Sequence, residues 1–135
     1  MAAYLEEPAR IPLHLRLGIW IAERKTGKRL LISRLLAWYP KAATGAGVME
    51  ALVAHEEGRA TARLLKLLRL YVSLRIECSF CVDMNSRDLA ASGITTAEVE
   101  ALQGRRPLGD VPGFSPTERL ALRYAIAITD TPASV

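Results

Sequence analysis

The chain has two cysteines, Cys78 and Cys81, which are separated by two residues within the stretch from Glu77 to Asn85. Two thiols at this spacing can close a small disulfide ring or supply half of a metal site, and a single cysteine can do neither. The surrounding pattern places both at the beginning of a helix, where unpaired backbone amides and the helix dipole stabilise a thiolate. The thiolate would attack a peroxide or a disulfide, and the other cysteine would resolve the product into an internal disulfide. We therefore favour a redox function for the pair.

Two alternatives stay open for these cysteines. Free cysteine is among the most buried residue types, so the pair could simply pack as small hydrophobic side chains between Leu-rich helices. A zinc site needs about four ligands, and the other soft candidates, His14 and His55, share no ligand spacing with the cysteines. We therefore expect neither a metal nor an organic cofactor.

Helices must position the pair, because the composition is that of an all-α protein. Half of the 135 residues are hydrophobic and only 6% are aromatic, while Ala, Leu, Arg and Glu dominate. Such a composition is typical of one compact helical domain. Apolar spacing, caps and Gly or Pro stops predict helices over residues 12–24, 33–39, 42–57 (or from 48), 59–77, 80–92 and 95–102, and one that starts at Ser115. Ser33 is the expected cap of the second helix, and Gly27 the expected end of the first.

The organisation of the chain follows from these elements. We expect residues 1–41 to form an N-terminal arm and helices, and residues 42–135 to form the helical core. Thr131-Pro132 predicts the start of a further helix, but the sequence ends three residues later. We therefore expect either a truncated chain or a partner subunit that supplies what is missing.

Polar residues recur every three or four positions along the predicted helix at 59–77, on an otherwise Leu-rich cylinder. They are Arg59, Arg63, Lys66, Arg69, Ser73 and Glu77. Because this stripe ends beside the first cysteine, we expect Lys66, Ser73 and Glu77 to face the same space as the thiols. The cations Lys66, Arg69 and Arg75 would lower the thiol pKa further.

Charge and hydropathy argue against nucleic-acid and membrane partners. The net charge of +4 is spread along the chain, and the densest basic cluster, at 24–29, has no interleaved stacking aromatics. Apolar runs reach only six residues, as at 17–22, far short of the ~20 that span a bilayer. Charged residues and a proline at 6–10 precede any apolar run, so we expect no signal peptide and a cytoplasmic protein.

The segment Cys-Ser-Phe-Cys-Val-Asp-Met-Asn at 78–85, preceded by the helix of Val72 and Ser73 and followed by an Ala-rich stretch to Gly93, resembles a known family. It is similar to the carboxymuconolactone decarboxylase-like superfamily, in particular its alkylhydroperoxidase D (AhpD)-like branch, over residues 42–130. The resemblance implies an orthogonal helical bundle that assembles into trimers or hexamers. It also implies a thiol peroxidase that acts on a small peroxide or disulfide and is regenerated by a thiol or dithiol reductant. Cys81 would attack the peroxide and Cys78 would resolve it.

The sequence departs from that family at two positions. Members carry a histidine four residues after the second cysteine and a glutamate twelve before the first, and here Asn85 and Lys66 stand in their places. Asparagine is no general base near neutral pH, and a lysine is protonated unless strongly desolvated. Lys66 could still favour the thiolate and Asn85 could hydrogen-bond a peroxide or a sulfur, with Glu77 as the nearest carboxylate. A non-catalytic or redox-sensing member of the same fold, or a decarboxylase-type enzyme, therefore stays an alternative.

Overall fold

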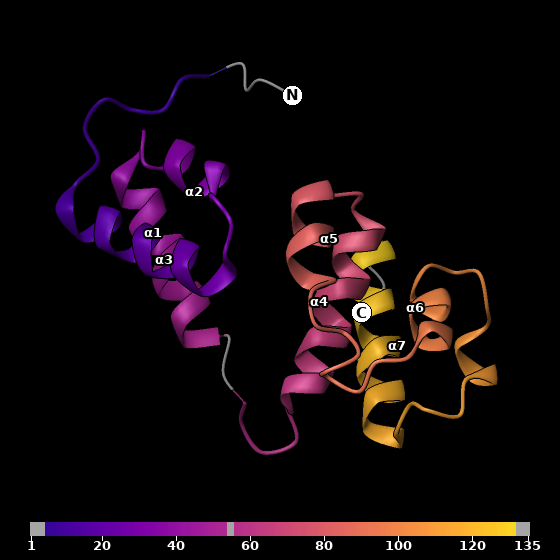
Figure 1. Cartoon of the computed structure of the whole chain (residues 1–135). Coiled ribbons are helices and arrows are strands. Elements are labelled where there is room, and N and C mark those ends of the chain that lie inside the picture. Colours follow the sequence, from indigo (N-terminus) through magenta and orange to yellow (C-terminus); the bar gives the residue numbers. More distant parts are fainter. Residues whose placement is uncertain (1–4, 54–55, 132–135) are drawn as a thin grey trace. The chain divides into compact units, whose positions relative to one another are not determined.

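The computed structural model describes residues 5–53 and 56–131, and these residues form an all-α protein (Figure 1). The all-α prediction is confirmed: within the described ranges there are helices and turns, with a single isolated β-bridge between Glu57 and Ala60. The chain divides into two compact units, residues 1–54 and 55–135. This division follows the third helix, whereas the sequence pattern predicted one at residue 41.

The first unit contains α1 (Leu13–Thr26), α2 (Leu31–Leu36) and α3 (Pro40–Val53). Gly27 ends α1 as predicted, since its φ of 64° lies in the left-handed region that glycine adopts without steric cost. Glu23 then joins α1 to α2 by accepting hydrogen bonds from Arg34 Nε at 2.8 Å and from the Leu30 amide at 2.9 Å. The Arg34 bond and the Leu30 amide lower the pKa of Glu23 to about 2.

The first unit has a small core and a large apolar surface. Its buried hydrophobic residues are Ile19, Leu30 and Ala37 within the described range. Its exposed large hydrophobic residues are Leu5, Leu13, Leu17, Trp20, Ile21, Leu31, Ile32, Leu36, Trp38, Tyr39, Val48, Met49 and Leu52. The helices of this unit therefore leave a large apolar surface exposed, which is costly in water.

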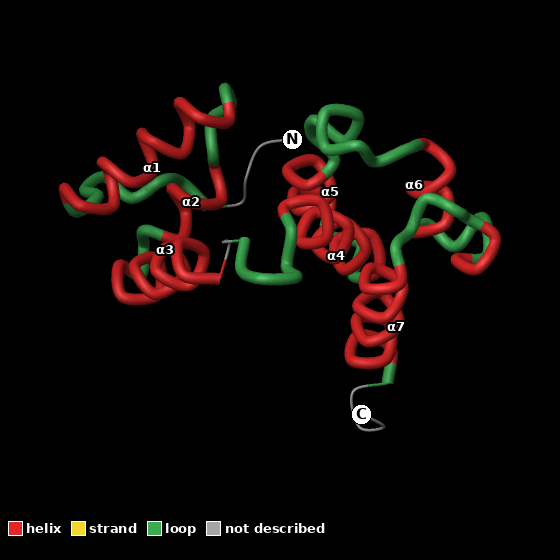
Figure 2. Tube along the Cα trace, turned by 90° about the horizontal axis from the view of Figure 1, so that it is seen from below, coloured by secondary structure: helices red, strands yellow, loops and turns green. Residues whose placement is uncertain are grey.

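The second unit contains α4 (Ala62–Arg75), α5 (Ser79–Asn85), α6 (Thr96–Leu102), the short 3-10 helix η1 (Leu108–Asp110) and α7 (Pro116–Asp130). The central helix α4 packs against both α5 and α7 (Figure 2). Its buried face supplies Leu67 and Leu70, which pack with Leu122 of α7 and with Val111 of the connecting loop. As predicted, α4 is therefore buried over much of its circumference.

Two buried glutamates organise the other side of this unit. The predicted capping boxes at Thr95 and Ser115 are confirmed, with Glu98 and Glu118 accepting the cap amides at 2.7 and 2.8 Å. Arg63 of α4 forms ion pairs with both carboxylates, to Glu118 at 3.0 Å and to Glu98. The starts of α6 and α7 are thereby tied to α4 through one guanidinium.

Two of the predicted helix limits need correction, and a third is not tested. Ser33 does not cap the second helix, because α2 already begins at Leu31 after Leu30, and no side chain caps it. The helix predicted over 80–92 ends at Asn85, and residues 86–93 form turns in which Asp88 has a φ of 51°, incompatible with a continuing helix. The helix start predicted at Thr131-Pro132 runs into residues 132–135, which lie outside the described part of the chain.

Candidate redox site

The end of α4 places the first cysteine. Glu77 adopts a φ of 54°, so the chain leaves the helix in the left-handed conformation. The Glu77 amide donates to the Leu74 carbonyl at 3.3 Å and the Cys78 amide donates to the Ser73 carbonyl at 3.2 Å. These two bonds make a Schellman motif, in which glycine is the usual residue at the left-handed position. The motif reverses the chain and brings Cys78 back to the level of Ser73.

The start of α5 places the second cysteine. Cys78 is the N-cap of α5, and its Sγ accepts a hydrogen bond from the Cys81 amide at 3.3 Å. Cys78 and Cys81 form a disulfide with their Cα atoms 5.2 Å apart, within the usual range for disulfide-bonded residues. Both are half-buried. The helix-start position predicted for the pair is confirmed, and the disulfide distance is compatible with a CxxC redox motif.

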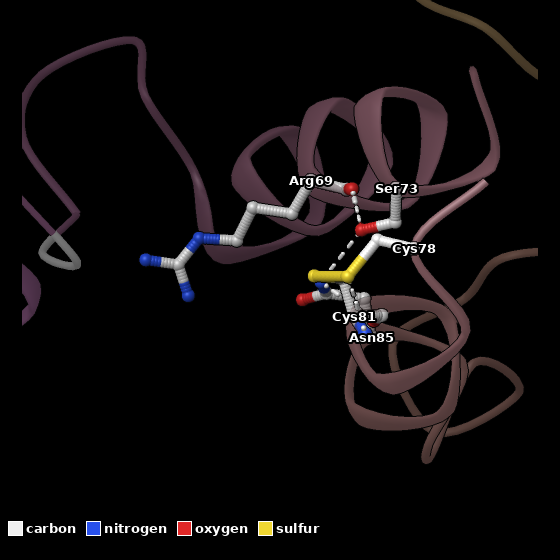
Figure 3. The surroundings of a disulfide bond; sticks show 5 residues. All are labelled: Arg69, Ser73, Cys78, Cys81 and Asn85. Carbon is white, nitrogen blue, oxygen red and sulfur yellow. Dashed lines mark hydrogen bonds between the residues drawn. A yellow bond between two sulfur atoms is a disulfide. The ribbon is translucent and has the colours of Figure 1, made fainter. Parts of the chain in front are cut away.

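Ser73 and Asn85 lie beside the pair and are bonded to each other. Asn85 Nδ2 donates to Ser73 Oγ at 3.0 Å and to the Cys81 carbonyl at 2.9 Å (Figure 3). Ser73 Oγ in turn donates to the Arg69 carbonyl at 2.6 Å. Ser73 is buried and Asn85 half-buried, so the Asn85 amide is oriented by protein groups. The structure thus brings together four of the six predicted site residues.

The cations expected to support a thiolate are less closely engaged. Arg75 forms an ion pair with Asp130 at 2.6 Å, and the Arg69 side chain extends away from the disulfide (Figure 3). Lys66 is half-buried on α4, and no hydrogen bond or ion pair joins it to the cysteines or to Asn85 within the described residues. Arg63, which the sequence pattern placed on the same stripe, turns to Glu98 and Glu118 instead.

Glu77, the remaining predicted site residue, is exposed and borders a groove. This groove has a volume of about 670 Å³ and lies between the end of α4, residues 101–108 and the end of α7. It is lined by the apolar side chains of Leu74, Leu102 and Ile126 and by the cations Arg105 and Arg106. Glu77, which precedes the first cysteine in the sequence, is therefore one of the residues that line this groove.

The histidines weighed as metal ligands lie elsewhere. His14 Nε2 is 3.2 Å from Thr44 Oγ1 in the first unit, and His55 lies outside the described residues. Within the described part of the chain, no three His, Cys, Asp or Glu side chains are grouped to hold a metal ion. Among the same residues, no helix has the length and apolarity needed to cross a membrane.

Comparison with known proteins finds neither a matching family model nor a matching solved structure. The chain is 33% identical over 131 residues to the uncharacterized protein YnjA of Escherichia coli strain K12. This similarity covers 94% of the chain and 68% of YnjA. The chain belongs to the YnjA family. The name of that relative assigns no reaction to the YnjA family, so the chemistry must be argued from the site.

Proposed function

We propose that the protein is a thiol-dependent oxidoreductase of the alkylhydroperoxidase D-like type, which reduces a small hydroperoxide or disulfide through Cys78 and Cys81. The observation that carries this proposal is the disulfide between the two residues at the start of α5. A pair that closes within one helical turn can store and release two electrons without a metal or an organic cofactor.

The reaction balances with the pair and one external reductant. With the dithiol reduced, the Cys81 thiolate attacks the peroxide, becomes a sulfenic acid and releases an alcohol. The Cys78 thiol then displaces the hydroxyl from that sulfur, which releases water and forms the disulfide. A thiol or dithiol supplies the two electrons and two protons that restore both thiols. The bond from the Cys81 amide to Cys78 Sγ at 3.3 Å favours negative charge on Cys78, which supports its departure as a thiolate when the disulfide opens.

The protein differs from members of the alkylhydroperoxidase D-like branch in its proton relay, because Asn85 and Lys66 stand in place of the histidine and the glutamate. Asn85 holds its amide toward Ser73 and the Cys81 carbonyl, and it cannot accept the proton of a thiol. Thiolate formation then depends on solvent as the base, so we expect slow turnover with peroxides. This property equally suits a slow redox sensor, in which the formation of the disulfide itself is the signal.

We further propose that the protein works as a homo-oligomer, a trimer or hexamer. The uncovered apolar side chains of α1, α2 and α3 support this, as does the exposed row Leu120, Tyr124 and Ile128 on α7. Residues four apart share one helix face, so this row is a continuous apolar stripe. Sedimentation velocity at several protein concentrations tests the assembly, and a monomer at micromolar concentration would exclude it.

Substitution of the cysteines tests the proposed reaction. Cys78→Ser and Cys81→Ser should each abolish turnover of an organic hydroperoxide with dithiothreitol as the reductant, because neither variant can close the disulfide. Ser79→Ala is the matched control, since Ser79 is exposed between the two cysteines and should retain the full rate. Turnover that persists in both cysteine variants would contradict the proposal.

A further inference from the structure

Hydrogen bonds connect Ser73 to the backbone of both cysteines, directly to Cys78 and through Asn85 to Cys81. It is a buried residue of α4, with 4% of its surface exposed. Its carbonyl accepts the Cys78 amide at 3.2 Å, while its hydroxyl accepts Asn85 Nδ2 at 3.0 Å. The hydroxyl proton is donated to the Arg69 carbonyl at 2.6 Å, so the oxygen lone pair is left to face Asn85. Both polar groups of this one residue are therefore engaged in the site.

Asn85 completes the connection on the other side. The same Nδ2 that donates to Ser73 also donates to the Cys81 carbonyl at 2.9 Å. One path of hydrogen bonds thus runs from Ser73 directly to the Cys78 backbone, and a second runs through Asn85 to the Cys81 backbone. Neither path uses a sulfur atom, so both can persist when the disulfide is reduced.

We propose that Ser73 is a positioning residue that, together with Asn85, holds the two cysteines at disulfide-forming separation in the reduced protein. Reduction removes the covalent link between the sulfurs, and an unrestrained dithiol would then gain conformations that must be lost again on closure. The clamp formed by Ser73 and Asn85 limits those conformations. It therefore raises the effective concentration of one thiol toward the other and favours the oxidised form. This inference rests on the redox activity proposed above.

The equilibrium constant for thiol exchange with glutathione measures how strongly the Ser73–Asn85 clamp favours the disulfide. In this exchange the dithiol gives two electrons and two protons to glutathione disulfide, and the products are the protein disulfide and two molecules of glutathione. Its equilibrium constant changes only if a substitution affects the reduced and oxidised proteins differently, so a general loss of stability does not move it. A neutral hydrogen bond contributes about 1 kcal/mol, and only the part of that energy that differs between the reduced and oxidised proteins moves the constant, so Ser73→Ala should lower it by up to about fivefold.

Three further variants sharpen this test. Asn85→Ala breaks the clamp at a half-buried position, and it should lower the constant by a similar factor even if Ser73→Ala proves unstable. Ser86→Ala is the control, because this exposed serine at the end of α5 takes no part in the clamp. The double variant Ser73→Ala/Asn85→Ala should match Asn85→Ala, since the Ser73–Asn85 bond that Ser73→Ala removes is already lost in Asn85→Ala.

The outcomes separate the inference from the proposed function. A decrease of more than twofold in Ser73→Ala or Asn85→Ala, with Ser86→Ala within twofold of the natural protein, supports the clamp. Constants within twofold of the natural protein in both clamp variants, or additive effects in the double variant, would overturn it while leaving the redox pair intact. Failure of the natural protein to exchange with glutathione at all would overturn both.

Discussion

Two polar clusters in residues 55–135 differ in the charge of their side chains and in the groups that they bind. In the first, Arg63 neutralises the buried carboxylates of Glu98 and Glu118, which also cap two helices. In the second, Ser73 and Asn85 bond to each other and to the backbone beside a half-buried disulfide. The charged groups of the first cluster pair with one another and connect α4 to the starts of α6 and α7. The second consists of neutral groups that hydrogen-bond to the backbone next to the disulfide, and we propose that they position the two cysteines.

Loss of Arg63 should have the largest effect on stability. Arg63→Met leaves two buried carboxylates without their cation, and breaking such a group costs roughly 3 kcal/mol or more. Urea denaturation followed by circular dichroism measures this cost, with the exposed Arg123→Met as the control. A loss below about 1 kcal/mol would show that the cluster does not fasten the helices. The glutathione equilibrium should stay unchanged in the same variant, because the redox pair lies in the other cluster.

The first cluster should also make folding sensitive to acid. Burial raises the pKa of Glu98, but the hydrogen bonds from Arg63 and Thr95 outweigh it and hold that pKa below its ordinary value of 4.5. A carboxyl with a depressed pKa contributes stability above the pKa of the unfolded chain, and that stability is lost as the pH falls through the folded pKa. We therefore expect the free energy of unfolding to fall below about pH 4.5.

Glu98→Gln tests the origin of that pH dependence. The variant should be less stable than the natural protein at pH 7, and its unfolding free energy should change less between pH 5 and pH 2.5. Glu23, whose pKa of about 2 in the first unit has a similar cause, should continue to contribute in both proteins. An unchanged slope in Glu98→Gln would assign the acid sensitivity to other carboxyls.

The smallest predicted effects concern two helix ends of the same design. Gly104 ends α6 with a φ of 73°, in the same Schellman geometry that Glu77 adopts after α4. Gly104→Ala should destabilise by about 1 kcal/mol because alanine is strained there. Glu77→Gly should stabilise by about 0.5 kcal/mol, after the added flexibility of the unfolded chain is subtracted. Thermal unfolding compares the two variants, and equal signs would contradict this view of Glu77.

If Gly104→Ala destabilises the protein and Glu77→Gly stabilises it, Glu77 is shown to hold an unfavourable backbone conformation. A residue that accepts backbone strain beside a reactive pair is a candidate for a functional role. A stabilised Glu77→Gly variant with reduced turnover would indicate that the carboxylate is kept for the reaction. Unchanged turnover would indicate that Glu77 only caps the helix.

Local signals in the sequence predicted much of this fold. Thr95 and Glu98, and likewise Ser115 and Glu118, satisfy helix amides three residues apart, so the capping boxes could be read without tertiary information. Gly27 was equally plain as a helix end. The helix-start position of the cysteines followed in the same way, because it depends only on neighbouring residues.

The rest depended on contacts between distant residues. The polar stripe seen in the sequence includes Arg63 and Ser73, but Arg63 turns to carboxylates 35 and 55 residues away. No signal in the neighbouring sequence shows whether an arginine at this position pairs with a distant carboxylate or faces solvent. The left-handed conformation of Glu77 and the early end of α5 were missed because neither position carries the glycine that normally announces it. The bond between Ser73 and Asn85 became visible only once α4 and α5 were packed together.

A redox titration of Cys78 and Cys81 tests the central claim most directly. Free thiols are trapped by alkylation across a series of reduced and oxidised dithiol buffers, and the mass of the protein reports how many have reacted. We predict one reversible two-electron transition at roughly −200 to −300 mV, the range of cytosolic dithiol couples. Two thiols that resist alkylation and oxidation at every potential until the protein unfolds would show that the pair is packed as structure, and would contradict the redox function.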